Sequence, residues 1–171
     1  MLLDYYHKAR GTGLETAGRT WYANAGAECA RLAAAHEVAH ATAAGIVAAL
    51  SPRMPWARNI TEAGNLLAGR TCAALGVSVR KAERIHAGED PAAVLATGPK
   101  TLAFWRALCG DLDAVVLDVW MLRAFGHDRD TVTPYQYRLL SETVRQTARS
   151  VACAPATFQA IVWCAIRGSA N

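Results

Sequence analysis

The sequence lacks any apolar run long enough to cross a bilayer. A spanning helix needs about 20 predominantly apolar residues, and the longest candidate, Ala41 to Leu50, is much shorter and rich in small side chains. We therefore expect no membrane segment. The opening MLLDYYHKARGTG has neither an apolar core nor a cleavage-like site, so we expect no secretory leader and a cytoplasmic location.

The sequence also has few lysines and no closely spaced pair of cysteines. Lys8, Lys81 and Lys100 are the only lysines, against 15 arginines, and the net charge is +4. Arginine suits planar phosphate and base contacts, and this mild basic excess permits a nucleic-acid partner without requiring one. The 5 cysteines are widely spaced with no C-x2-C pair. They indicate small buried residues in a reducing compartment rather than a disulfide framework or a metal site.

Alanine, in contrast, is abundant, with 36 residues among 171. It is the best helix former, and β-branched runs are scarce, which predicts an all-α protein. With 53% apolar and 19% charged residues, the chain can bury a core and is not typical of disorder. We expect a single compact helical unit over residues 1–171, and a monomer.

Capping signals and apolar spacing predict eight to ten helices. Asp90 and Asp118 precede helical patterns as N-caps, Thr133-Pro134 marks a further helix start, and Gly168 follows the last helix as a stop signal. The expected helical segments are 14–40, 41–50, 56–67, 79–86, 91–96, 99–109, 119–125, 134–151 and 155–167.

Three residues in this pattern suggest chemistry. Lys100 follows the glycine turn between two short predicted helices, Asp118 lies 18 residues later at a helix start, and Arg123 follows 5 residues after that. Helix amides stabilise an ionised carboxylate, and a lysine amine is a nucleophile when its pKa is lowered. Taken alone, Lys100 is more typical of a solvated side chain, and Asp118 is more typical of an ordinary helix cap. Because Asn also caps helices well, Asp118→Asn is expected to preserve the helix start.

The segment GPKTLAFWRALCGDLDAVVLDVWMLRAF resembles the helix-hairpin-helix DNA glycosylase superfamily, which includes endonuclease III. Gly98, Lys100 and Thr101 match that family's hairpin string, and Asp118 and Arg123 match its catalytic string at the same spacing. The similarity extends over about residues 40–168.

Flanking strings add to the resemblance. ALSPR, ending at Arg53, is similar to the loop that fills the gap left by an extruded base, with Arg53 in place of a glutamine. Trp56 and Asn59, and further on Gln159 and Trp163, resemble strings of small actinobacterial and phage relatives.

The resemblance implies two small helical lobes around a cleft, DNA as partner, and excision of a modified or damaged base, favouring pyrimidines. A base must leave the duplex to be reached. Asp118 would stabilise positive charge at C1′, and Lys100 would add an abasic lyase step. The remaining implied roles are DNA contacts for Gly98, Thr101, Arg53 and Arg123, and a base pocket or wedge for Trp56, Asn59 and Trp120.

The sequence departs from the family at several positions. Ala96 replaces the first hairpin glycine, Pro99 removes an amide donor, and Trp120 stands where the family has a histidine. Four clustered cysteines for an iron–sulphur centre are missing, so we expect no cofactor. The tryptophans also suit ordinary core packing. A glycosylase-like protein that binds DNA without cleaving it, in phage DNA modification, is therefore an alternative.

A second alternative comes from His36-Glu37-Val38-Ala39-His40, a literal HExxH string. On a helix it would place both imidazoles on one face for zinc, with Glu37 as a base. The metzincin third histidine is replaced by Ile46, which leaves Glu62 as the only third ligand at gluzincin spacing. Alanine-rich helices produce such strings by chance, and we expect no metal site.

Overall fold

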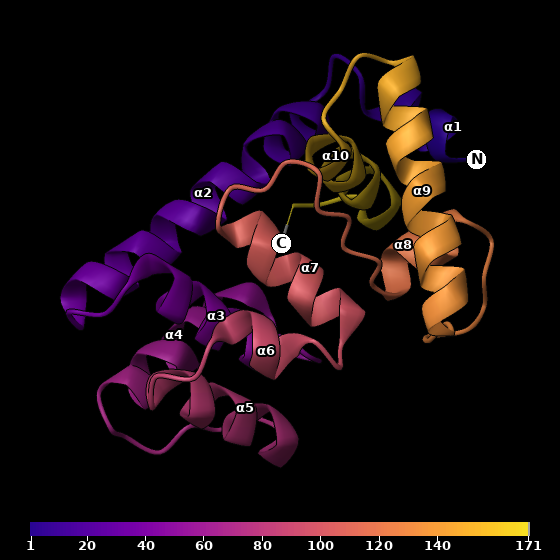
Figure 1. Cartoon of the computed structure of the whole chain (residues 1–171). Helices are drawn as coiled ribbons and strands as arrows, with labels where there is room; N and C mark the ends of the chain where they lie inside the picture. The colour runs from indigo at the N-terminus through magenta and orange to yellow at the C-terminus, as the bar shows by residue number, and fades with distance from the viewer. Residues whose placement is uncertain (171) are drawn as a thin grey trace. The chain divides into compact units, whose positions relative to one another are not determined.

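The computed structural model describes residues 1–170 and is entirely helical over that part, with ten α-helices and no strand (Figure 1). This confirms the all-α fold class. The helices are α1 (Leu2–Ala9), α2 (Gly13–Ala35), α3 (His40–Leu50), α4 (Trp56–Leu67), α5 (Gly76–His86), α6 (Pro91–Leu95), α7 (Pro99–Leu108), α8 (Val119–Ala124), α9 (Pro134–Ser150) and α10 (Pro155–Arg167).

Most predicted helix starts and ends are confirmed. Many of them are determined by a local side chain or glycine that satisfies the unpaired backbone N–H or C=O groups at the helix end. Asp90 accepts from Ala92 N at 3.1 Å, and Thr133 forms a capping box with Gln136. Gly168 ends α10 in the left-handed conformation, with φ 73°.

One helix and two helix boundaries differ from the expectation. The helix α1 was not predicted. The expected helix 14–40 ends at Ala35, where a turn precedes α3, and α5 begins at Gly76 rather than at Val79.

The described residues form two compact units, with the boundary inside α2. The first unit comprises Met1–Asn24 and Gly110–Ala170, and the second comprises Ala25–Cys109. Each unit is described separately below.

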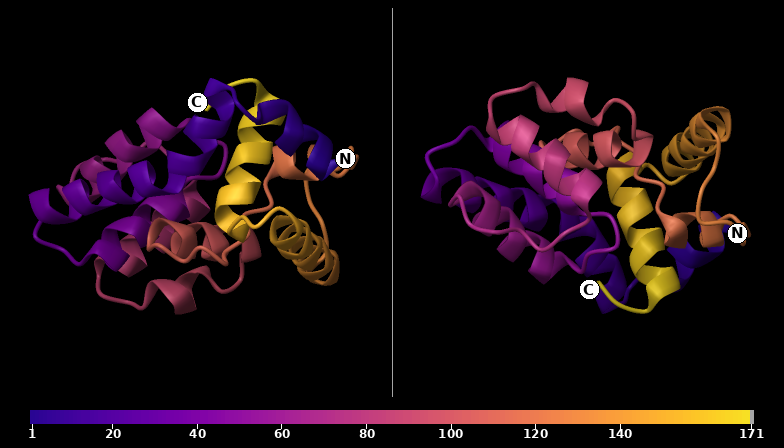
Figure 2. Two further views of the ribbon diagram at one scale, coloured as in Figure 1. Left: turned by 90° about the horizontal axis from the view of Figure 1, so that it is seen from above. Right: turned by 90° about the horizontal axis from the view of Figure 1, so that it is seen from below.

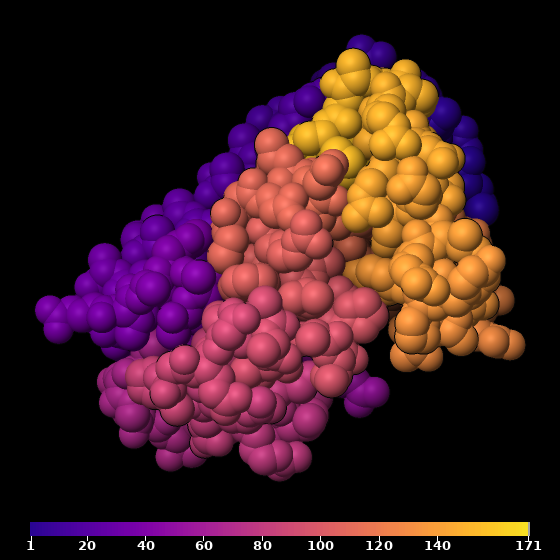
Figure 3. Space-filling view, viewed as in Figure 1, coloured from indigo at the N-terminus to yellow at the C-terminus, as the bar shows by residue number. Residues whose placement is uncertain are grey.

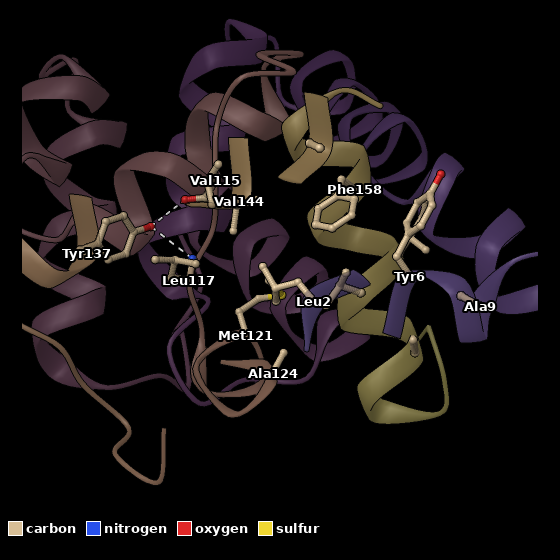
Figure 4. Close-up of a cluster of buried hydrophobic side chains, with 14 residues drawn as sticks. Leu2, Tyr6, Ala9, Val115, Leu117, Met121, Ala124, Tyr137, Val144 and Phe158 are labelled. Carbon is tan, nitrogen blue, oxygen red and sulfur yellow. Dashed lines mark hydrogen bonds between the residues drawn. The ribbon is translucent and has the colours of Figure 1, made fainter. Parts of the chain in front are cut away.

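In the first unit, α10 packs against α1, α8 and α9, and it is drawn in yellow in Figure 2. Its core contains Tyr6 stacked on Phe158, with ring centroids 5.2 Å apart, and Leu2, Val115, Leu117, Met121, Val144 and Ile161 (Figure 4). The helix α9, orange in Figure 3, carries Tyr135 and Leu139 on its exposed side.

In the second unit, α3 is the central helix and contacts α4, α5, α6 and α7. Its residues 43–50 are all buried. Gly45 permits this packing, because a Cβ there would lie 2.9 Å from Pro91 Cβ at the start of α6. A buried helix must be apolar on all sides, which explains why this segment has no polar face.

No single helix of residues 1–170 has the length and apolarity of a membrane span, although α2 with α3 and α9 with α10 pass that test as bent pairs.

Candidate functional site

Asp118 lies in the first unit at the N-cap of α8, where a rigid backbone segment places it. The preceding residues Val115 to Leu117 are buried. The Tyr137 hydroxyl donates to Val115 O at 2.8 Å and accepts from Leu117 N at 3.3 Å, as Figure 4 shows. Because both bonds satisfy buried backbone groups, they fix the path of the chain into Asp118.

The Asp118 carboxylate has a donor on each oxygen. Oδ1 accepts from Met121 N at 2.9 Å, which confirms the predicted cap. Oδ2 accepts from Trp163 Nε1 of α10 at 2.8 Å. Hydrogen bonds to an ionised acceptor are roughly twice as strong as neutral ones, so the two donors hold the negative charge in one orientation.

The sequence indicates Trp163 only through a string similar to that of small relatives, and Trp163 is not among the predicted site residues. Its position could have been found from spacing, because Gln159, Trp163 and Arg167 recur every 4 residues and share one face of α10. The partner of that face, Asp118, lies 45 residues earlier in the sequence, a distance that periodicity does not report.

Two arginines lie over the tryptophan rings beside Asp118. The Arg167 guanidinium carbon is 4.4 Å from the Trp163 ring centroid and 5.7 Å from that of Trp120. The Arg123 guanidinium carbon is 4.8 Å from the Trp120 centroid. Asp118, Trp120, Trp163, Arg123 and Arg167 are called the Asp–Trp–Arg cluster below. It brings together three of the predicted site residues.

The cluster continues toward α2. Trp21 lies 6.1 Å from Trp163 between ring centroids, and the Tyr22 hydroxyl donates to Gln159 Oε1 at 2.9 Å. Burial raises the pKa of Tyr22 well above its usual value, and the negative charge of Asp118 adds to that rise. Tyr22 therefore stays a neutral donor at ordinary pH.

The predicted hairpin lies in the second unit. After α6, the residues 96–98 form a tight turn into α7, where Lys100 is the second residue and is half-buried. Thr101 Oγ1 donates to Gly98 O at 2.9 Å, and Lys81 Nζ donates to Thr97 Oγ1 at 3.2 Å. The Lys81 ammonium group thus contacts the hairpin, and Lys100 lies in the helix that follows it.

Gly98 is required by a close approach rather than by an unusual backbone angle. Its φ is −123°, which any residue adopts. A Cβ at this position would lie 2.6 Å from Thr101 Oγ1, so a side chain would displace the Thr101 hydroxyl from the Gly98 carbonyl.

The other predicted site residues of the second unit differ in accessibility. Arg53 is exposed in the loop after α3, with φ 61°, and lines a surface hollow with Arg58. Trp56 is half-buried, and its Nε1 donates to Glu28 Oε2 at 3.1 Å. Asn59 is only 1% exposed and donates from Nδ2 to Val47 O at 3.0 Å. Asn59 therefore joins α4 to α3 and is not accessible to a base in this conformation.

The HExxH string does not form the helical motif. It spans the turn between α2 and α3, with Glu37 at φ 54° and His40 as the first residue of α3. His40 Nε2 lies 3.2 Å from Gly26 O. Glu62, the suggested third ligand, accepts from Ala73 N at 2.8 Å, and that bond is the main cause that lowers its pKa. Over residues 1–170, no three His, Cys, Asp or Glu side chains are placed to hold a metal ion.

These features define the class as an all-helical protein with an Asp–Trp–Arg cluster in one unit and a glycine hairpin in the other. The chain belongs to the family of unknown function DUF7178, whose model matches residues 1–170. No curated protein and no solved structure matches the chain.

Proposed function

We propose that the protein is a DNA-binding base-excision glycosylase of the helix-hairpin-helix type, acting on a modified or damaged base. The observation that carries the proposal is the carboxylate of Asp118, held by Met121 N and Trp163 Nε1 beside tryptophan and arginine side chains.

A carboxylate held in this way can assist cleavage of a glycosidic bond. As the base departs, positive charge develops on the sugar at C1′, and a fixed negative charge stabilises that state more than it stabilises the neutral bound nucleotide. A carboxylate that already has two donors needs no rearrangement when the charge develops. Asp118 acts here by electrostatics.

The surrounding side chains suit a flipped nucleotide. Tryptophan rings stack on an extruded base, and Arg123 and Arg167 carry planar guanidinium groups that bind phosphate. Trp120 is half-buried, and its ring is covered by arginine side chains that a base could replace.

The second unit supplies the proposed DNA-backbone contacts. By our count from the sequence, it has 9 lysines and arginines against 6 carboxylates, a net +3, whereas the first unit has 9 against 8. The hairpin at Gly98 and Thr101 and the exposed Arg53 would bind phosphates. The role of Lys100 as a lyase nucleophile rests on the resemblance.

A non-cleaving DNA-binding protein is the second candidate. The same two hydrogen bonds that orient Asp118 also describe a purely structural cap, which joins α8 to α10 without chemistry. Such a protein would bind DNA through phosphates and release no base. The zinc-hydrolase alternative has less support, because the HExxH string lies in a turn.

The test is incubation of the protein with duplex oligonucleotides that carry a panel of modified bases, followed by detection of abasic sites. The expected result is base release from at least one modified duplex, lost in Asp118→Ala. Binding that weakens steeply with salt, as phosphate contacts require, but without abasic product would favour the non-cleaving candidate. Absence of DNA binding at low salt would contradict both.

A further inference from the structure

We propose that Trp120 and Trp163 form a stacking site for a planar heteroaromatic base and that the guanidinium of Arg167 is its built-in occupant, displaced when a base enters. This inference rests on the proposed function and names the residue that controls access to the Asp–Trp–Arg cluster.

The contacts that position the Trp120 and Trp163 rings come from residues other than Arg167. Trp163 is anchored by its hydrogen bond to Asp118 at 2.8 Å and by Trp21, 6.1 Å away between centroids. Trp120 belongs to α8, two residues after the Asp118 cap. Both rings are only half-buried. Asp118 therefore anchors the Trp163 ring directly and caps the helix that carries Trp120.

Arg167 is held differently. It is the last residue of α10, followed by Gly168 at φ 73°, and it lies over both rings at 4.4 and 5.7 Å. Arg19 and Arg84 form ion pairs with glutamates at 2.7 and 2.6 Å. Arg167 makes no ion pair within residues 1–170. The ring contacts are thus what retains its guanidinium.

A nucleobase can replace this occupant, because both groups are planar and stack on aromatic faces. Stacking of a base on an aromatic ring is at least as strong as a half-exposed cation–π contact. The displaced guanidinium stays close on its flexible stem and keeps its charge, which lets it pair with a phosphate of the incoming nucleotide. The exchange thus couples base entry to phosphate binding.

The experiment uses the full chain and the free nucleoside 2-aminopurine riboside, whose fluorescence is quenched by stacking. Arg167→Ala should bind the nucleoside about tenfold more tightly than the wild-type protein, because the only guanidinium of residues 1–170 that lies over both rings is gone and Arg123 remains over Trp120 alone. Arg138→Ala, an exposed arginine of α9, makes the same charge change and should leave nucleoside affinity unaltered. Adding Trp120→Leu to Arg167→Ala should abolish the gain, and circular dichroism should show all variants folded.

The outcomes test the occupant role of Arg167 and the glycosylase proposal independently of each other. Unchanged or weaker nucleoside binding by folded Arg167→Ala overturns the occupant role, even if the wild-type protein excises bases. A gain that survives Trp120→Leu places the nucleoside elsewhere and also overturns it. A tenfold gain in a protein that binds no DNA leaves the stacking site standing and removes the glycosylase proposal.

Discussion

Replacement of Asp118 by asparagine tests the geometry of the cluster. Capping preference alone predicts a small effect, since Asn is as good an N-cap as Asp. The structure predicts otherwise, because the carboxylate accepts from Met121 N and from Trp163 Nε1 at 2.9 and 2.8 Å. An amide has one acceptor oxygen, so its NH2 group must face one of these two N–H donors in either orientation.

The size of the effect follows from these bonds. Hydrogen bonds to charged groups contribute about 1.5–3 kcal/mol, and a donor left unsatisfied costs about 1–3 kcal/mol. We expect Asp118→Asn to lower the free energy of unfolding by about 2 kcal/mol. In a Trp163→Phe background the opposing indole donor is gone, so the same substitution should cost only about 0.5 kcal/mol. The coupling between the two sites is therefore about 1.5 kcal/mol.

Urea unfolding of the wild-type protein, both single variants and the double variant, followed by far-UV circular dichroism, measures this coupling. Independent sites add to within about 0.5 kcal/mol, so additive losses would refute the reasoning and show that the indole contact carries little energy. The single variants of this double-mutant cycle are also useful in the base-release assay. Trp163→Phe keeps the Asp118 charge but removes the indole donor and changes the ring under Arg167, so base release by this variant reports the combined loss of orientation and stacking.

Three further predictions follow from packing, titration and chemistry. Gly18→Ala should destabilise the first unit by about 2 kcal/mol, because the new Cβ would lie 2.5 Å from Ile161 Cα. Overpacking costs up to about 3 kcal/mol, and the higher helix propensity of alanine recovers about 1 kcal/mol. Gly13→Ala in the same helix meets nothing within 4 Å and should leave the thermal melt nearly unchanged. Burial raises the pKa of Tyr137 to about 12, so the phenol ionises first in the unfolded chain, near pH 10. The stability that Tyr137 confers is therefore present below pH 10 and lost as the pH rises toward 12. Tyr137→Phe should be less stable than wild type at pH 7, and urea titrations should show that this difference in unfolding free energy narrows above pH 10. On a duplex from which the protein releases base, borohydride should trap a covalent adduct with wild type and not with Lys100→Ala; trapping by the variant would assign the nucleophile to another residue.

The fold was predictable where a local side chain determines the backbone. Asp90 and Asp118 cap their helices as predicted, and the helix predicted to start at Thr133-Pro134 begins there, since each start involves only the next three residues. The helix α1 was missed because its apolar residues acquire meaning only against α10, more than 140 residues later. The break after Ala35 was missed because alanine-rich sequence carries no stop signal there.

The candidate site was predictable only in part, for the same reason. Asp118 and Arg123 were found from a motif, but the Trp163 donor and the Arg167 stack depend on how α10 packs against α8. Asn59 was expected in a base pocket because it lies in a string that resembles one of small relatives, and the structure buries it with its Nδ2 on Val47 O. Polarity alone does not distinguish a recognition group from a buried hydrogen-bonding group.

The split of the first unit between the two ends of the chain has a consequence for synthesis on the ribosome. The second unit is contiguous and complete once Cys109 has emerged, but α1 cannot dock until α10 exists. At about 5–20 residues per second, the roughly 60 residues after Cys109 take about 3–12 s to translate. During that interval Leu2 and Tyr6 lack their partner helix, so α1 is exposed to chaperones and proteases until α10 has been synthesised.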